Sequence, residues 1–219
     1  GLSNTALAVY SESGQSQPRY RTWNGTSWST QGSMSSIGAT AQWVRLTADP
    51  SSDLILMVAL DANDDLEANR WTGSSWVGNQ QFESTPGGHS SRRLDLCFEP
   101  GGTGRALLLY RERKSNRPMY RVWDGSAWGS ELRGPNINRK LERVQVVPGG
   151  SAGELFVACS DHANDLHLFR WNGASLSADT EIETSLGVSG SGTEPMCLVG
   201  SAGGASKPKV KSWTEAAPQ

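Results

Sequence analysis

Short apolar runs separated by clusters of Gly, Ser, Asn and Asp recur along the whole sequence. Residues 54–60 are continuously apolar, which is typical of a strand covered on both faces. Residues 42–46 alternate more between polar and apolar side chains than this run does, as expected of a half-exposed strand. Runs of these two kinds predict an all-β protein built of short strands and many turns.

The apolar runs belong to a repeat of about 50 residues that is nested in a repeat of 100 residues. The segment at residues 20–28 returns at residues 120–128, and the segment at 69–76 returns at 169–176. Further pairs keep the same offset: Tyr10 and Tyr110, Asp61 and Asp161, Cys97 and Cys197. All four tyrosines lie in the odd units, so the chain alternates two unlike units, odd and even.

Each unit is expected to contain four strands, called A, B, C and D here in chain order. Type C carries an Arg-Trp motif, and type D is expected to start at the next Trp. The other two types are expected at residues 42–46, 93–98, 142–147 and 195–199 (A), and at 6–10, 54–60, 106–110 and 155–160 (B). A tandem four-stranded unit of about 50 residues is typical of a β-propeller blade, with a β-sandwich as the alternative.

The sequence therefore predicts one β-propeller domain over residues 1–219, with about four four-stranded blades. The approximate blade repeats are 5–49, 50–100, 101–150 and 151–200, and residues 201–219 form a closing strand or tail. A fifth B strand is expected at residues 210–215, because Trp213 and Glu215 match Tyr110 and Glu112.

Three explanations of this extra strand stay open. It forms an edge or cap, it replaces the first B strand when the ring closes, or the chain is one piece of a longer array. A small ring closed by pairing of the terminal strands is the favoured interpretation, and two chains that complete one larger ring come second.

The loop between strands C and D carries Asn24-Gly25 in the first unit and Asp124-Gly125 in the third. Both dipeptides predict a two-residue type I′ turn. Such a turn would pair Trp23 with Thr26 and would place Trp28 diagonally from Trp23.

The unit at residues 106–128 resembles the blades of fucose-binding fungal and bacterial propeller lectins. It also resembles blade repeats of secreted and surface bacterial proteins. This resemblance implies a sugar held between blades by Arg, Glu and aromatic side chains, and a secreted or cell-surface location. Arg111 and Glu112 are among the nearest matches by residue type. The candidate ligand-binding residues are Tyr20, Arg21, Trp23, Glu112, Tyr120, Arg121 and Trp123.

Composition excludes several classes of function. The net charge is −2, so no basic stripe predicts nucleic-acid binding, and no apolar run is long enough to span a membrane. The three cysteines lie in apolar runs, which favours buried thiols over a single disulfide.

The acidic loops at residues 61–65 and 161–165 could bind Ca²⁺ through carboxylate and amide oxygens. A turn is the favoured interpretation, because Asn and Asp bond to their own backbone. The possible Ca²⁺ ligands are Asp61, Asn63 and Asp65 in one loop and Asp161, Asn164 and Asp165 in the other. The three histidines have no Cys or second His at zinc-ligand spacing, so no zinc site is predicted.

No single catalytic motif stands out. Glu12, Glu112 and Glu215 recur at the ends of B strands, and recurrence argues against one active site. We therefore expect a non-enzymatic binding or adhesion propeller for a glycan or protein ligand, present as a monomer or as a strand-sharing homodimer. A protein-interaction scaffold within a larger surface protein is the alternative, and a glycoside hydrolase is the minor one.

Overall fold

The computed structural model describes residues 5–83, 91–187, 196–200 and 209–212. These residues form only β-strands, turns and loops, as the apolar pattern predicts, and no membrane-spanning helix is found among them. The chain divides into two compact units, residues 1–89 and 90–219, which are described separately.

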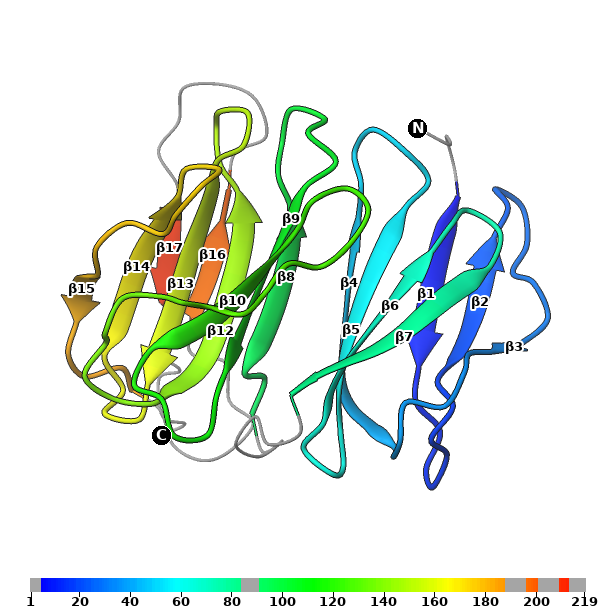
Figure 1. Ribbon diagram of the computed structural model, residues 1–219, viewed down its shortest axis with the longest axis horizontal. Helices are drawn as coiled ribbons and strands as arrows, with labels where there is room; N and C mark the ends of the chain where they lie inside the picture. Colours follow the sequence, from blue (N-terminus) through cyan, green and yellow to red (C-terminus); the bar gives the residue numbers. More distant parts are fainter. Residues whose placement is uncertain (1–4, 84–90, 188–195, 201–208, 213–219) are drawn as a thin grey trace, which may run out of the picture. The chain divides into compact units, whose positions relative to one another are not determined.

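The first unit contains two antiparallel sheets in which each strand pairs with the next one along the chain (Figure 1). The first sheet has three strands: β1 (Ala6–Tyr10), β2 (Arg19–Trp23) and β3 (Gly32–Ser33). The second has four: β4 (Ala41–Ala48), β5 (Ile55–Asp61), β6 (Leu66–Trp71) and β7 (Trp76–Glu83).

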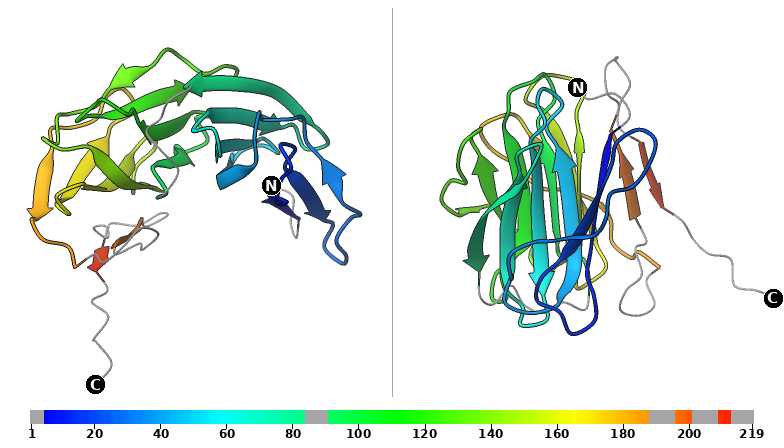
Figure 2. Two further views of the ribbon diagram at one scale, coloured as in Figure 1. Left: turned by 90° about the horizontal axis from the view of Figure 1, so that it is seen from below. Right: turned by 90° about the vertical axis from the view of Figure 1, so that its right-hand side faces the viewer.

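The second unit repeats this design with two four-stranded sheets and a terminal hairpin (Figure 2). One sheet consists of β8 (Leu94–Phe98), β9 (Ala106–Arg111), β10 (Pro118–Trp123) and β11 (Leu132–Arg133). The next consists of β12 (Leu141–Pro148), β13 (Leu155–Asp161), β14 (Leu166–Trp171) and β15 (Thr180–Glu183). The hairpin is β16 (Met196–Val199) with β17 (Lys209–Ser212).

The predicted strand types are confirmed for A, B and C. The A strands are β4, β8, β12 and β16, and the B strands are β1, β5, β9, β13 and β17. The D prediction holds only for β7, which starts at Trp76; Trp28, Trp128 and Leu176 form isolated bridges, and β3, β11 and β15 start later. β17 takes the predicted fifth B position beside β16, whereas Trp213 and Glu215 lie outside the described residues. The number of blades and the closure of a ring stay predictions.

Burial explains why the B strands β5 and β9 are continuously apolar. Leu56 to Leu60 in β5 and Leu107 to Leu109 in β9 are each at most 1% exposed, so both faces of these strands are covered. One core forms in the first unit around Met57 and Ala59, and a larger one forms in the second around Leu107, Leu109 and Val157. Each fully buried aliphatic side chain contributes about 1.5–3 kcal/mol to stability.

The cysteines follow the same rule. Cys97 in β8 and Cys159 in β13 are buried thiols, and Cys197 in β16 is a half-buried thiol. This agrees with the predicted role of the cysteines as small apolar side chains.

The predicted two-residue turn between strands C and D is wrong. Of its two central residues, only Gly25 has a positive φ, 102°, and Trp23 pairs directly with Trp28. The Asn24 side chain accepts hydrogen bonds from the backbone N–H groups of Thr26 and Ser27, each at 2.9 Å. Because the side chain supplies the acceptor, a longer loop closes without a second residue at positive φ. The two indoles therefore pack at 5.6 Å between ring centroids.

Candidate functional site

The predicted binding residues of β2 point to opposite faces of their sheet. Tyr20 pairs with Val9 of β1, and Arg21 pairs with Ala8. Since side chains alternate along a strand, Tyr20 lies on one face and Arg21 and Trp23 lie on the other. The sequence motif therefore contributes to two different surfaces.

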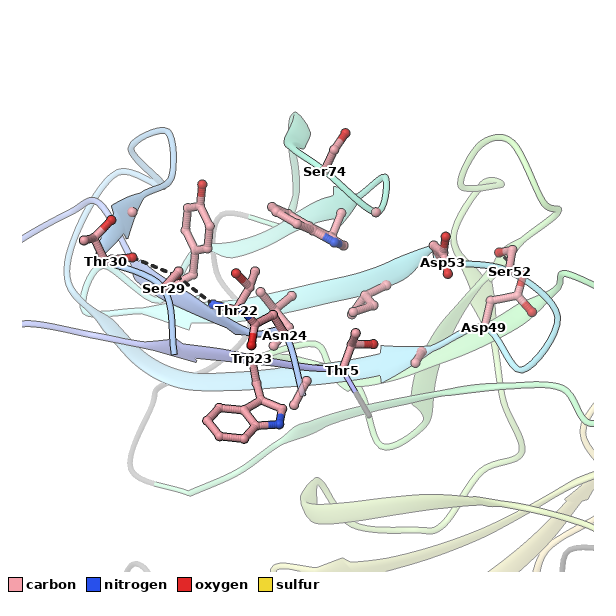
Figure 3. Close-up of a pocket in the computed structure, with 18 of the residues that line it drawn as sticks. Thr5, Thr22, Trp23, Asn24, Ser29, Thr30, Asp49, Ser52, Asp53 and Ser74 are labelled. Carbon is pink, nitrogen blue, oxygen red and sulfur yellow. Dashed lines mark hydrogen bonds between the residues drawn. The ribbon is translucent and has the colours of Figure 1, made fainter. Parts of the chain in front are cut away.

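The Tyr20 face borders a pocket of about 780 Å³ within the first unit. Its wall combines β1 and β2 with the loop after β4, the start of β5 and the end of β6 (Figure 3). The volume lies within the range of about 300–1,000 Å³ that is common for small-molecule sites. The polar lining residues are Thr5, Thr22, Asn24, Ser29, Thr30, Gln31, Asp49, Ser52, Asp53 and Ser74.

Aromatic rings form one wall of this pocket. Tyr20 from β2 and Trp71 from β6 both line it, with their ring centroids 5.5 Å apart in an edge-to-face arrangement. Trp76 supports both rings, at 6.2 Å from Tyr20 and 5.6 Å from Trp71. Such edge-to-face contacts stabilise the orientation of each ring, so the wall is formed before a ligand enters.

The opposite end of the pocket is acidic and rich in hydroxyl groups. Asp49, Ser52 and Asp53 gather there, as Figure 3 shows. Burial pushes the pKa of Asp49 upward, but hydrogen bonds from Ser51 and Ser52 outweigh this effect and lower the pKa. Asp49 is therefore a carboxylate fixed in its turn, whereas Asp53 is exposed and can meet a ligand.

The place of the Tyr20 ring depends on Gly32 in β3, because a Cβ atom at this position would overlap that ring. We expect Gly32→Ala to displace Tyr20, to change the near-ultraviolet circular dichroism of the aromatic cluster and to lower the free energy of unfolding by about 1–3 kcal/mol. Gly150→Ala is the control, because its Cβ would enter open space. Equal spectra and equal stability for the two variants would contradict the proposed role of Gly32.

The second unit fills the equivalent place with its own side chains. Tyr120 again packs edge-to-face on the Trp of the next sheet, Trp171, at 5.8 Å. Here the Trp171 indole N–H donates to Glu99 at 2.8 Å, and Arg105 donates to the Gly173 carbonyl, also at 2.8 Å. In the second unit, the odd sheet (β8 to β11) and the even sheet (β12 to β15) therefore meet in a packed core. The first unit has an open pocket at the equivalent place.

On the opposite face, the arginines of the motif bind their own sheet. Arg21 donates to the Ser29 carbonyl and Arg121 to the Gly129 carbonyl, each at 2.8 Å. Arg121 also donates to the hydroxyl of Tyr110, at 3.2 Å, and that hydroxyl donates to Glu131 at 2.6 Å. Burial raises the pKa of Tyr110, and the hydrogen bond to Glu131 raises it further as the second largest cause. These bonds hold strands B, C and D together.

The remaining predicted residues lie apart from the pocket, or line it only at its edge. Trp123 is 3% exposed and packs on Trp128, while Trp23 borders the pocket with its indole turned away from Ser74 in Figure 3. Glu12 forms an ion pair with Arg19 at 2.9 Å, so its carboxylate binds within the sheet. Glu112 lacks this pair, because Met119 stands where the first unit has Arg19.

Sequence analysis missed Trp71, Asp49, Asp53 and the polar residues after Trp28 as parts of one pocket. The alternation of side chains on β2 could have separated Tyr20 from Arg21. Nothing in the local sequence indicates that the loop after β4 meets β2, since that meeting depends on the packing of two sheets.

Comparison with protein-family models and with curated protein sequences gave no match. Solved structures with a similar fold include the BP39L lectin from Burkholderia pseudomallei, with 12% identity, a TM-score of 0.62, and coverage of 83% of this chain and 53% of that one. A lectin from Aleuria aurantia in complex with Fucα1-6GlcNAc has 13% identity, a TM-score of 0.55, and coverage of 82% and 58%.

The chain thus resembles fucose-lectin β-propellers in fold, and it spans just over half the length of these two lectins. A sialidase, NanB from Streptococcus pneumoniae, is similar too, with 13% identity, a TM-score of 0.51, and coverage of 78% of this chain and 29% of that one. The similarity shows propeller-like sheets, and such a fold does not by itself determine the function.

Proposed function

We propose that this protein is a non-catalytic carbohydrate-binding module and that the pocket of the first unit holds the sugar. The observation that carries the proposal is the arrangement of Tyr20 and Trp71 opposite Asp53 and several hydroxyl groups. Aromatic rings pack on the apolar face of a sugar, and carboxylate and hydroxyl groups bond to its hydroxyls. The lectin-like fold supports this choice of ligand class.

The chemistry of the pocket supports binding rather than hydrolysis. A glycosidase uses a carboxyl group with a raised pKa as its general acid, together with a second carboxylate. Of the acids that line this pocket, Asp49 has a lowered pKa and already accepts hydrogen bonds from Ser51 and Ser52. Asp49 is therefore suited to accept hydrogen bonds and not to donate a proton as a general acid.

A glycan array followed by calorimetric titration of the best ligand tests the proposal. We expect Asp53→Ala to weaken binding about 10–100-fold, the loss of one hydrogen bond to a charged group. Tyr20→Ala should weaken it at least about tenfold through loss of the aromatic wall. Asp53 is exposed, so its substitution should leave the fold intact.

Two variants serve as controls for the position of the site. Asp124→Ala changes an exposed acid of the second unit, and Trp28→Ala changes the 49% exposed indole that packs on Trp23. Both should bind like the unchanged protein. An array without hits, or equal loss of affinity in Trp28→Ala and Asp53→Ala, would contradict the proposed pocket.

A further inference from the structure

Three side chains that can bind a metal ion converge at one end of the sheet formed by β12 to β15. Asp161 ends β13, His167 lies in β14, and Asp165 lies in the loop between these strands. One ligand atom from each lies within 4.8 Å of the others. The side chains of Asp161 and His167 are fully buried, with His167 Nε2 at 3.7 Å from Asp161 Oδ2. Asp165 is half-buried and leads toward solvent.

A second carboxylate orients the His167 ring. Asp179, in the loop before β15, places its two oxygens 2.9 and 3.1 Å from His167 Nδ1. Nδ1–H therefore donates to Asp179, and the lone pair of Nε2 points into the cluster. Histidines that bind metal ions commonly donate their other N–H to a carboxylate in this way.

The atoms that face one another in this cluster are both acceptors without a partner. Asp161 Oδ1 accepts the backbone N–H groups of Ala163 and Asp165, at 2.8 and 2.9 Å. Asp161 Oδ2 and His167 Nε2 are buried and have no hydrogen-bond partner. Buried polar atoms are nearly always satisfied, so this pair of acceptors calls for a hydrogen-bond donor or a cation between them.

The first unit shows how the equivalent aspartate, Asp61, is satisfied without a cation. There Asp61 Oδ2 accepts the backbone N–H of Ala39 at 2.8 Å. In the second unit the corresponding N–H, that of Arg139, donates to the Ile137 carbonyl at 2.7 Å and leaves Asp161 Oδ2 without its partner. Glu67 and Asn79 stand in place of His167 and Asp179. The second unit alone thus combines an imidazole with an orienting carboxylate at this position of the described residues.

We propose that Asp161, Asp165 and His167 form a binding site for Zn²⁺, with Asp179 positioning the imidazole and water completing the coordination. A set of one imidazole and two carboxylates suits Zn²⁺, whereas Ca²⁺ prefers oxygen ligands alone. Bonds of about 2.0–2.1 Å in a tetrahedral site place ligand atoms about 3.3 Å apart. The observed 3.7 Å needs only a small approach of the two side chains.

The site would act on stability rather than on catalysis. Two of its ligands are buried, and the ion would join the end of β13 to β14 and, through Asp179, to the chain that enters β15. The competing arrangement is a protonated imidazole that bridges Asp179 and Asp161 without any metal.

Calorimetric titration of chelator-treated protein with ZnCl₂ separates these arrangements. We expect one Zn²⁺ per chain and a melting temperature that rises with the concentration of Zn²⁺, whereas CaCl₂ at the same concentration gives no shift. His167→Asn and Asp165→Asn should remove this binding, and Asp179→Asn should weaken it about 10–100-fold. Asp165 is half-buried, so its variant keeps the test valid if His167→Asn does not fold.

His162→Ala and Glu67→Gln are the matched controls. His162 is a more exposed histidine in the same loop that pairs with Glu142, and Glu67 occupies the position of His167 in the first unit. Both variants should keep the affinity for Zn²⁺. The absence of Zn²⁺ binding would favour the bridging proton and overturn the proposal, as would unchanged binding in both His167→Asn and Asp165→Asn.

Cobalt substitution tests the ligand set directly. Cys159 is the cross-strand partner of His167 and is fully buried. A Co²⁺ complex of the proposed site should lack a thiolate-to-cobalt charge-transfer band. Such a band would show that Cys159 binds the ion and would overturn the assignment to Asp161, Asp165 and His167.

Discussion

Asp61→Ala is expected to lower the free energy of unfolding by about 3–5 kcal/mol, because three backbone N–H groups would lose their acceptor. The Asp61 side chain is fully buried at the end of β5. Its Oδ1 accepts the N–H groups of Asn63 and Asp65, each at 2.9 Å, and its Oδ2 accepts that of Ala39 at 2.8 Å. Urea denaturation followed by tryptophan fluorescence measures the change.

Two other acidic residues give graded controls for this prediction. Asp161 accepts hydrogen bonds from only two backbone N–H groups. In the presence of a chelator, Asp161→Ala should therefore lower the free energy of unfolding by less than Asp61→Ala does. Asp124 also accepts two, from Ser126 and Ala127, but in an exposed loop where water can replace it. Asp124→Ala should cost at most about 1 kcal/mol. Similar costs for Asp61→Ala and Asp124→Ala would refute the role assigned to burial.

The strands could be predicted because their signal is local. The apolar run at residues 54–60 predicts a strand covered on both faces, and β5 is buried there. The 100-residue repeat predicts the same kind of strand at β13. The turn at Asn24 was predicted wrongly, because Asn-Gly suits both a type I′ turn and a loop closed by the Asn side chain. The backbone geometry of Asn24 decides between them, and the dipeptide alone does not fix it.

The candidate sites depend on contacts that sequence spacing does not encode. The pocket needs Trp71 and Asp53 from one sheet beside Tyr20 from another. The spacing of Cys and His residues does not indicate the proposed metal site, because its ligands besides the single histidine are carboxylates. Its orienting residue, Asp179, reaches His167 only through the pairing of β14 with β15.

The pH dependence of the free energy of unfolding should be dominated by Glu67, which faces Asp61 and Asp65 from β6. Glu67 is 4% exposed and its Oε2 has no hydrogen-bond partner. Burial, together with the negative charges of Asp65 and Asp61, raises the pKa of Glu67 to about 7. In the unfolded chain this pKa is about 4.3. Between these values the folded protein binds one proton more than the unfolded chain.

Stability should therefore fall as the pH rises from about 4.3 to about 7, since the folded state must then give up a proton that it holds more tightly. The loss from Glu67 alone is on the order of 3 kcal/mol. Glu67→Gln keeps the shape of the protonated side chain and removes the charge. We expect this variant to match the unchanged protein near about pH 4 and to exceed its stability by on the order of 3 kcal/mol near about pH 8.

Denaturation curves of both proteins across this range of pH test the sign and the size of the effect. A stability difference that does not change with pH would show that Glu67 keeps an ordinary pKa in the folded state. The carboxylate of Asp61 should be coupled to it, because that negative charge stabilises the loop and destabilises ionised Glu67. In a double-mutant cycle at about pH 8, Asp61→Ala should therefore cost more in the Glu67→Gln background than in the unchanged protein, where its cost is partly offset by relief of the repulsion.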